Sequence, residues 1–334
     1  MPRRFPTALA ALAVAAVSVV ACSPASSPAS SPAGTPTASP LTAPTASRPR
    51  APTTTPPPAP EGTSTPAGAV PVDPGHPCSG APPAPVRHVV VVMMENRALT
   101  QVAGNAAAPY LDSLATACGL ATDYSGVAHP SLPNYIAVTS GSTQSVSDDA
   151  GPGSHPLGAP SIFSLLGADW RSLEESMPRP CDTASSGEYA VKHNPAAYYT
   201  MLSAACPARD LPLGGTAFDL SAAYTFVTPD LCHDGHDCST ATADAWLAKE
   251  VPVMLASPQY RSGSTVVFIT WDENDAGGAL VPTYVIAPSV VPGARVAAPL
   301  DHYSLLRTSE ELLGLSPLLG NAETATSMVS LFHL

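Results

Sequence analysis

Four acidic residues follow apolar runs that predict buried strands: Glu95, Asp230, Asp272 and Glu273. In an open α/β sheet the carboxyl ends of parallel strands meet at one edge, so these side chains would converge there. Converging carboxylates repel one another unless a cation lies between them. The pattern therefore predicts a divalent metal site at that edge, although each acid taken singly fits a loop or a helix cap equally well.

A loop between two predicted elements is rich in potential metal ligands. Within residues 229–238 it carries Asp230, His233, Asp234, His236 and Asp237. Carboxylates and imidazoles are suitable ligands for divalent ions, and a neighbouring carboxylate can orient the second ring nitrogen of a histidine. Five ligands exceed what one ion takes from one loop, so some of them would bind substrate phosphate or orient their neighbours. The alternative is a polar turn pinned by a disulfide.

The candidate nucleophile is Ser131, in the segment His129-Pro130-Ser131-Leu132-Pro133-Asn134-Tyr135. It precedes a predicted helix over 132–140, where free N–H groups and the helix dipole favour an anion. A serine at this place would meet a phosphate group already held by those N–H groups. The alternative is that Ser131 only caps the helix. The sequence contains no Gly-x-Ser-x-Gly, Walker A or His-Glu-x-x-His segment, which weakens other hydrolase interpretations.

The elements that must position these residues alternate between strands and helices. Apolar, β-branched runs predict strands at 87–94, 224–228, 264–271 and 284–287, with a shorter extended stretch at 188–191. Helices are predicted at 109–118, 132–140, 242–256 and 304–313. This alternation predicts an α/β fold with a doubly wound, mostly parallel sheet and helices on both faces.

The start of the chain predicts export. Residues 1–21 have a basic start and a short apolar run, as in a signal peptide, and they end in a segment that resembles a lipoprotein box with Cys22 as the lipidated residue. Residues 22–85 are rich in Pro, Ser and Thr and predict a disordered tether. Residues 86–334 are the predicted folded domain. We expect it to be anchored through Cys22 to the outer face of the cell membrane, or to be secreted.

Cysteine usage agrees with export. Six cysteines remain after Cys22, and an even number in an extracellular protein favours three disulfides. Proximity in the sequence favours Cys232–Cys238 and Cys181–Cys206, which leaves Cys78–Cys118.

The charge of the predicted domain argues against nucleic acid as a partner. Residues 86–334 contain 10 of the 14 Lys and Arg but 24 of the 26 Asp and Glu. A phosphate backbone requires a basic surface, whereas a single phosphate group can be bound where a metal locally reverses the field.

Six segments in this order resemble the bacterial phosphoesterase family of acid phosphatases and phospholipases C, in the alkaline-phosphatase-like superfamily. The resemblance runs from about residue 89 to residue 315. The segments are Val91 to Arg97, His129 to Gly141, Lys192 to Pro195, Pro229 to Cys238, Thr270 to Asn274 and His302 to Arg307.

The resemblance implies a divalent metal, as one ion or two, at the carboxyl edge of a doubly wound sheet. Its implied metal ligands are Glu95, Asn96, Ser131, Asp272 and Glu273. Its implied ligands for phosphate or a second metal are Asp230, His233, Asp234, His236, His193, Asn134 and His302.

The implied reaction is metal-dependent hydrolysis of a phosphate monoester through a phosphoserine on Ser131. His236 or His302 is expected to protonate the leaving oxygen. The partner would be a small phosphate ester, with a phospholipid headgroup as one possibility. The alternatives are a phospholipase C-type phosphodiesterase and a non-catalytic binding lipoprotein, the second of which predicts loss of the nucleophile or of a ligand.

Overall fold

The computed structural model describes residues 75–214, 218–274 and 280–334. The predicted signal peptide, Cys22 and most of the predicted tether lie outside these residues. Among the described residues, no helix combines the length and the apolar character needed to cross a bilayer.

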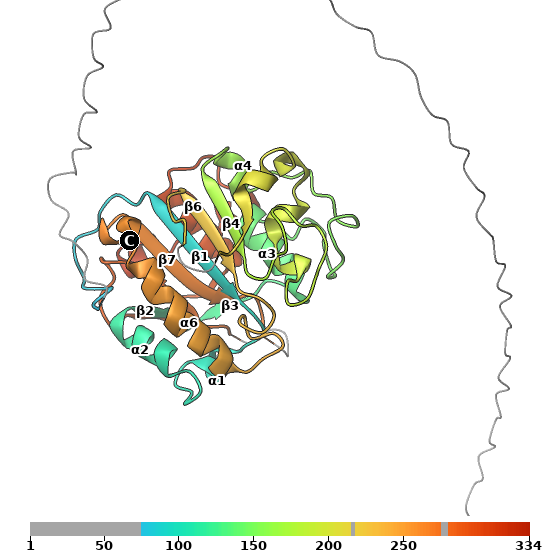
Figure 1. The fold of residues 1–334 in the computed structure, drawn as a ribbon. Helices are drawn as coiled ribbons and strands as arrows, with labels where there is room; N and C mark the ends of the chain where they lie inside the picture. Colours follow the sequence, from blue (N-terminus) through green and yellow to red (C-terminus); the bar gives the residue numbers. More distant parts are fainter. Residues whose placement is uncertain (1–74, 215–217, 275–279) are drawn as a thin grey trace, which may run out of the picture. The chain divides into compact units, whose positions relative to one another are not determined.

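One eight-stranded sheet forms the centre of the fold, with strand order β5-β4-β6-β1-β7-β8-β2-β9 (Figure 1). Its strands are β1 (His88–Met94), β2 (Gly119–Ala121), β4 (Trp170–Glu174), β5 (Asp210–Pro212), β6 (Tyr224–Thr228), β7 (Thr265–Trp271), β8 (Thr283–Ile286) and β9 (Arg295–Val296). A separate pair joins β3 (Tyr124–Ser125) to β10 (Leu300–Asp301). β8 pairs antiparallel with β7 and β2, and the other pairings in the sheet are parallel. The prediction of a mostly parallel sheet is confirmed.

β1 lies at the middle of this sheet because its sequence is apolar on both sides. Residues 89–94 are fully buried, and the strand pairs in parallel with β6 on one side and β7 on the other. A continuous β-branched run of this kind is typical of a parallel strand covered on both faces. Since β1, β4, β6 and β7 run in one direction, the residues after their last positions meet at one edge of the sheet.

The helices from α1 to α7 lie in connections between strands, and α8 and α9 follow β10. They are α1 (Leu99–Val102), α2 (Pro109–Ala117), α3 (Ser131–Ser140), α4 (Ile162–Leu165), α5 (Cys206–Arg209), α6 (Thr240–Leu255), α7 (Pro258–Arg261), α8 (His302–Leu312) and α9 (Val329–Phe332). α2 packs beside α6 in front of the sheet in Figure 1, and α3 packs against α8. The four helices expected from the sequence are confirmed within two residues at each end.

One expected strand is wrong. The stretch at 188–191 has a single bridge between Ser186 and Tyr189 and then turns into a 3-10 helix over Val191–His193. The turn is favoured because the Ser185 hydroxyl accepts a hydrogen bond from the Val191 N–H at 3.0 Å, and no strand of the sheet pairs with this segment. This side of the sheet is completed by β4 and, at its edge, β5, and the sequence patterns revealed neither strand.

All three predicted disulfides are confirmed: Cys78–Cys118, Cys181–Cys206 and Cys232–Cys238. The first one changes the expected start of the domain. Cys78 is 3% exposed, and the Tyr260 hydroxyl donates to the Pro77 carbonyl oxygen at 2.6 Å. The folded part therefore begins upstream of residue 86, because this disulfide and these contacts hold part of the proline-rich segment against the core.

Candidate active site

Ser131 is the first residue of α3, and its side chain faces the carboxyl edge of the sheet. The N-cap position belongs to Pro130, which is extended and offers no capping side chain. Ser131 is only 2% exposed, and its hydroxyl donates to Glu95 Oε2 at 3.0 Å. The alternative that Ser131 merely caps the helix is therefore excluded.

Glu95, directly after β1, is the centre of the site and is fully buried. The Tyr135 hydroxyl donates to Glu95 Oε1 at 2.7 Å, and His193 Nε2 lies 3.1 Å from the same oxygen. Tyr135 is four residues beyond Ser131 on α3, so both side chains lie on one face of the helix. The His193 ring stacks on the Tyr135 ring with centroids 5.1 Å apart. One helix face thus brings the candidate nucleophile Ser131 and the Tyr135 hydroxyl to the carboxylate.

Asp272 follows β7 at the same edge and is also fully buried. Its Oδ1 accepts a hydrogen bond from the Asn96 backbone N–H at 3.2 Å, so the main chain of Asn96 helps to orient the Asp272 carboxyl group. The Asp272 carbonyl oxygen is 2.7 Å from His302 Nε2, and the Tyr124 hydroxyl is 3.0 Å from His302 Nδ1. A carbonyl only accepts, so Nε2 of His302 carries the proton and Nδ1 accepts from Tyr124.

His302 therefore holds the backbone of Asp272 in place through its carbonyl oxygen. Burial lowers the pKa of His302 to about 4, and both ring nitrogens are used inside the protein. This arrangement does not fit the expected role of His302 as the proton donor to the leaving group, because neither nitrogen faces a substrate.

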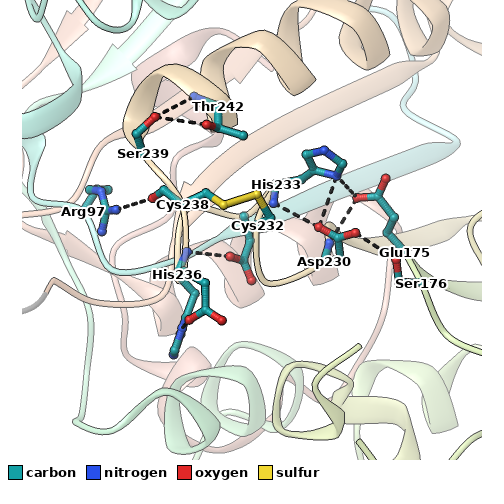
Figure 2. The surroundings of a disulfide bond; sticks show 12 residues. Arg97, Glu175, Ser176, Asp230, Cys232, His233, His236, Cys238, Ser239 and Thr242 are labelled. Carbon is teal, nitrogen blue, oxygen red and sulfur yellow. Dashed lines mark hydrogen bonds and ion pairs between the residues drawn. A yellow bond between two sulfur atoms is a disulfide. The ribbon is translucent and has the colours of Figure 1, made fainter. Parts of the chain in front are cut away.

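The ligand-rich loop follows β6 and is closed by the Cys232–Cys238 disulfide, drawn in yellow in Figure 2. Arg97 Nη2 donates to the Cys238 carbonyl oxygen at 2.8 Å and ties the loop to the chain after β1. Asp234 is buried, and its Oδ1 accepts from the His236 backbone N–H at 2.6 Å. Its other oxygen lies 3.2 Å from His193 Nδ1. Asp234 and His236 therefore join the group around Glu95.

The electrostatics of this group favour a bound cation. Burial raises the pKa of Glu95, Asp234 and Asp272, and at Glu95 the charges of the other two raise it further. Burial lowers the pKa of His193 to about 3, which leaves its imidazole neutral, the form that binds metals. Among the described residues, His193 Nε2, Asp234 Oδ2 and Asp272 Oδ2 are buried and make no well-formed hydrogen bond, although the first two lie 3.1 Å and 3.2 Å from an ionisable neighbour. Glu95, His193 and His236 offer ligand atoms within 4.8 Å of one another. These donors fit a divalent ion.

Asp230 and His233 belong to a second cluster, on the other side of the loop from His236 in Figure 2. His233 Nδ1 lies 3.0 Å from Glu175 Oε2 and 3.1 Å from Asp230 Oδ1. The Ser176 hydroxyl donates to Asp230 Oδ2 at 2.8 Å. The three ligand atoms of this cluster also lie within 4.8 Å of one another, but the hydrogen bonds inside it already occupy them. The cluster fastens the loop to the segment after β4.

Glu273 and Asn134 lie beside the site, where they contact the segment that leads into α3. Glu273 pairs with His129 Nδ1, and burial raises the pKa of Glu273 to about 7. Asn134 Oδ1 accepts from the N–H groups of Val127 and Ala128 at 2.9 and 3.0 Å, and its Nδ2 donates to the Ala128 carbonyl oxygen at 3.0 Å. Asn134 thus stabilises the turn that leads into α3, with both ends of its amide used there.

The sequence patterns did not single out Tyr135, Lys192 or Glu175 as parts of the site region. Tyr135 and Lys192 stand inside segments that carried the family resemblance, so a signal for both was present. Lys192 Nζ lies 3.1 Å from Asp149 Oδ2 and 3.2 Å from His236 Nε2. Glu175 follows β4, and recognising that strand would have added it to the acids at strand ends.

Comparisons with known proteins identify the family of the chain. The model of the phosphoesterase family matches residues 105–316. The chain is 30% identical over 256 residues to the phosphatidylinositol-3-phosphatase of Mycobacterium tuberculosis, over 73% of this chain and 82% of that protein. It is 24% identical over 252 residues to the phosphate-repressible acid phosphatase of Penicillium chrysogenum, over 66% of this chain and 58% of that protein.

The fold has a counterpart among solved structures. A member of the alkaline phosphatase superfamily from Vibrio parahaemolyticus superposes with a TM-score of 0.51 and 10% sequence identity, over 73% of this chain and 71% of that one. This likeness concerns the fold and confirms the expected alkaline-phosphatase-like architecture. Fold, family model and relatives agree: the chain belongs to the phosphoesterase family and is a hydrolase of phosphate esters.

Proposed function

We propose that this protein is a metal-dependent phosphatase that cleaves phosphate monoesters through a phosphoserine formed on Ser131. The observation that carries the proposal is the 3.0 Å hydrogen bond from the Ser131 hydroxyl to Glu95 at the start of α3. The hydroxyl lies beside a group of buried carboxyl groups and a neutral imidazole, at a helix end that favours an anion.

The atoms around Glu95 suit one divalent ion. Glu95, Asp234 and Asp272 would offer carboxylate oxygens, and His193 would offer a ring nitrogen, which leaves His236 free for another role. A bound ion supplies a lowered pKa at the Ser131 hydroxyl and neutralises charge on a phosphate oxygen. The distinct hydrogen bonding of the Asp230–His233 cluster supports one ion at this site rather than two.

Glu95, Tyr135 and His236 have different proposed roles in the reaction. Glu95 Oε2 orients the Ser131 hydroxyl and is placed to accept its proton when Oγ attacks phosphorus. Tyr135 holds Glu95 in that orientation. His236 is the proposed proton donor to the leaving oxygen, since its ring is partly exposed and its Nδ1 is hydrogen-bonded to Asp237 at 2.7 Å. Water then attacks the phosphoserine from the side that the alcohol left: it would give a proton to His236, and Glu95 would return a proton to Ser131 Oγ as the bond from that oxygen to phosphorus breaks and phosphate leaves.

The names of the relatives support a monoester substrate. One is a phosphatidylinositol-3-phosphatase and the other an acid phosphatase. We therefore propose a small phosphate monoester or a phosphorylated lipid headgroup as the substrate of this chain.

We also propose that the protein works outside the cytoplasm, lipid-anchored through Cys22 or secreted. Three disulfides support this location, because such bonds persist in oxidising compartments.

The test is hydrolysis by the purified protein, disulfides intact, of a chromogenic phosphomonoester and of the matching phosphodiester. Both are measured before and after chelation. Ser131→Ala is expected to lose at least roughly a thousandfold in kcat, since it removes the nucleophile. Ser140→Ala is the matched control, because Ser140 is a buried serine at the other end of α3.

Monoester turnover that is lost on chelation and in Ser131→Ala, but kept in Ser140→Ala, supports the proposal. Turnover of the diester alone would move the protein to the phospholipase C type. A folded, metal-supplied protein that cleaves neither ester would refute the proposal for these substrates and favour a binding role.

A further inference from the structure

An acidic side chain from the loop after α3 sits at the start of that helix. Asp149 Oδ1 accepts a hydrogen bond from the Leu132 backbone N–H at 3.0 Å. Asp149 Oδ2 accepts one from Lys192 Nζ at 3.1 Å. Both oxygens of a single anion are thus held by a helix N-terminal amide and an ammonium group.

These two donors are the kind that bind phosphate oxygens. Leu132 directly follows the nucleophile Ser131, and α3 has ten residues, so its first N–H groups carry the positive end of a full helix dipole. The positive charge of Lys192 is attracted by the carboxyl groups of Glu95 and Asp272, and its Nζ is 3.2 Å from His236 Nε2. A phosphate bound to Lys192 and to the Leu132 N–H would therefore lie beside Ser131.

A second observation marks the same place as a ligand position. His193 adjoins Lys192 in the chain and is 2% exposed, and its Nε2 lies 3.1 Å from Glu95 Oε1 without a well-formed hydrogen bond among the described residues. Glu95, His193 and His236 offer ligand atoms within 4.8 Å of one another, and Lys192 contacts His236, so a phosphate on Lys192 would lie beside the proposed ion. Asp149, in contrast, is a part-exposed residue whose side chain is 30% accessible.

The backbone around Asp149 is held independently of this contact. Asp148 Oδ1 accepts from the Ala150 N–H at 2.9 Å and lies 2.6 Å from His155 Nε2. The Tyr198 hydroxyl donates to the Ala150 carbonyl oxygen at 3.2 Å. Asp149 can thus leave its two donors by rotation of its side chain, without displacement of the loop.

We propose that Lys192 and the Leu132 N–H form the seat for the phosphoryl oxygens of the substrate, and that Asp149 is an internal anion that occupies this seat until a phosphate group displaces it. The inference rests on the proposed function and names the groups that bind the phosphate. Without substrate, Asp149 keeps the ammonium in place and satisfies the helix amide. With substrate, its negative charge opposes the incoming phosphate.

The test is the binding of inorganic phosphate to the purified, metal-supplied protein, followed by calorimetry. Asp149→Asn keeps an oxygen that can accept from Leu132 but removes the competing charge. We expect it to bind phosphate about tenfold more tightly, equivalent to about 1.4 kcal/mol, and to lower KM for the chromogenic monoester by a similar factor. Asp148→Asn is the matched control, since it removes the same charge one residue away. It should leave phosphate binding unchanged.

Lys192→Met tests the seat itself. It should weaken phosphate binding about tenfold, and Lys192→Arg should restore part of the loss because it keeps the charge. In the Lys192→Met background, Asp149→Asn should no longer tighten binding to the same extent, because the competition is for Lys192.

Unchanged or weaker phosphate binding in Asp149→Asn would overturn the inference, as would equal tightening in Asp148→Asn, which would indicate a general effect of net charge. The proposed function fails separately. If the wild-type protein cleaves no phosphate ester but the variants shift phosphate affinity as expected, the seat stands and the catalytic proposal falls. If the wild-type protein does cleave the monoester but Asp149→Asn does not change phosphate affinity, the catalytic proposal stands and the inference about Asp149 falls.

Discussion

At the scale of single residues, the site depends on what surrounds one carboxylate. Glu95 is fully buried, receives the Ser131 hydroxyl on one oxygen and the Tyr135 hydroxyl on the other, and has His193 within 3.1 Å. A buried carboxyl group that is surrounded by these three neighbours retains its orientation only while they are present. We therefore expect Tyr135 to be a positioning residue whose effect on catalysis passes through Glu95.

We expect Tyr135→Phe to lower kcat for the monoester about 10- to 100-fold and to raise the metal concentration needed for half-maximal activity. Tyr199→Phe is the control, since the Tyr199 hydroxyl also contacts α3, through Thr139, but not Glu95. The measurement is kcat against metal concentration for both variants. An equal loss of kcat in both variants would mean that removing any buried hydroxyl at α3 lowers activity, and that the contact with Glu95 has no special role.

At the scale of elements, α8 links the site to the end of the chain. Its first residue, His302, supports Asp272, and near its last turn Glu310 is fully buried and accepts from the Leu319 N–H at 3.1 Å. Burial raises the pKa of Glu310 to about 7. In the unfolded chain this carboxyl group titrates at about 4.3, so between these values the native state holds a proton that the unfolded state has lost.

The stability contribution of Glu310 is therefore complete below about pH 4.3 and is lost as the pH rises towards 7. Glu310→Gln keeps an acceptor for Leu319 and removes the titration. Relative to wild type, we expect the variant to gain unfolding free energy as pH rises, about 3–4 kcal/mol by pH 7.5 compared with below pH 4.3. The measurement is Tm of both proteins between pH 4.5 and 7.5. A constant difference across that range would contradict the assignment.

Glu311→Gln is the control for that experiment. Glu311 neighbours Glu310 on α8 but is partly exposed, and it pairs with Arg307 Nε at 2.8 Å. Loss of an exposed pair at i,i+4 costs about 0.3–0.5 kcal/mol.

At the scale of the whole molecule, the disulfides fasten segments that the sheet does not hold. Cys78–Cys118 fastens the chain before β1 to the residue after α2, and Cys232–Cys238 closes the loop that carries Asp234 and His236. The stabilisation from a disulfide grows with the length of the closed loop. Stability and activity should therefore depend on different bonds.

Replacing Cys78 and Cys118 together by serine should lower the unfolding free energy by about 4 kcal/mol, for a separation of 40 residues. The same change at Cys232 and Cys238 should remove only about 2 kcal/mol, for a separation of 6. The second pair of substitutions should nevertheless lower kcat/KM more. Urea unfolding and monoester turnover are measured on each variant. A larger activity loss in the Cys78–Cys118 variant would show that the loop does not need its disulfide.

Local patterns in the sequence were enough to predict much of this protein. The run after His88 is apolar on every side chain, so it could only be a buried strand, and the acid that follows it had to lie at a sheet edge. Glu95 and Asp272 were predicted in this way, as were the helix that begins beside Ser131 and the three disulfide pairs. Such features depend on neighbours in the chain, and their physics is visible in spacing alone.

Only the tertiary structure decided which of these residues meet. Asp272 and Glu273 are adjacent in the sequence, yet Asp272 joins the group around Glu95 while Glu273 pairs with His129, because the chain bends where β7 ends and the two side chains meet different neighbours. Lys192 lies in a single turn of 3-10 helix and Asp149 in a loop, so nothing in their spacing shows that they meet at the start of α3. Side-chain direction and long-range packing determine such contacts, and a single sequence does not encode them in any local pattern.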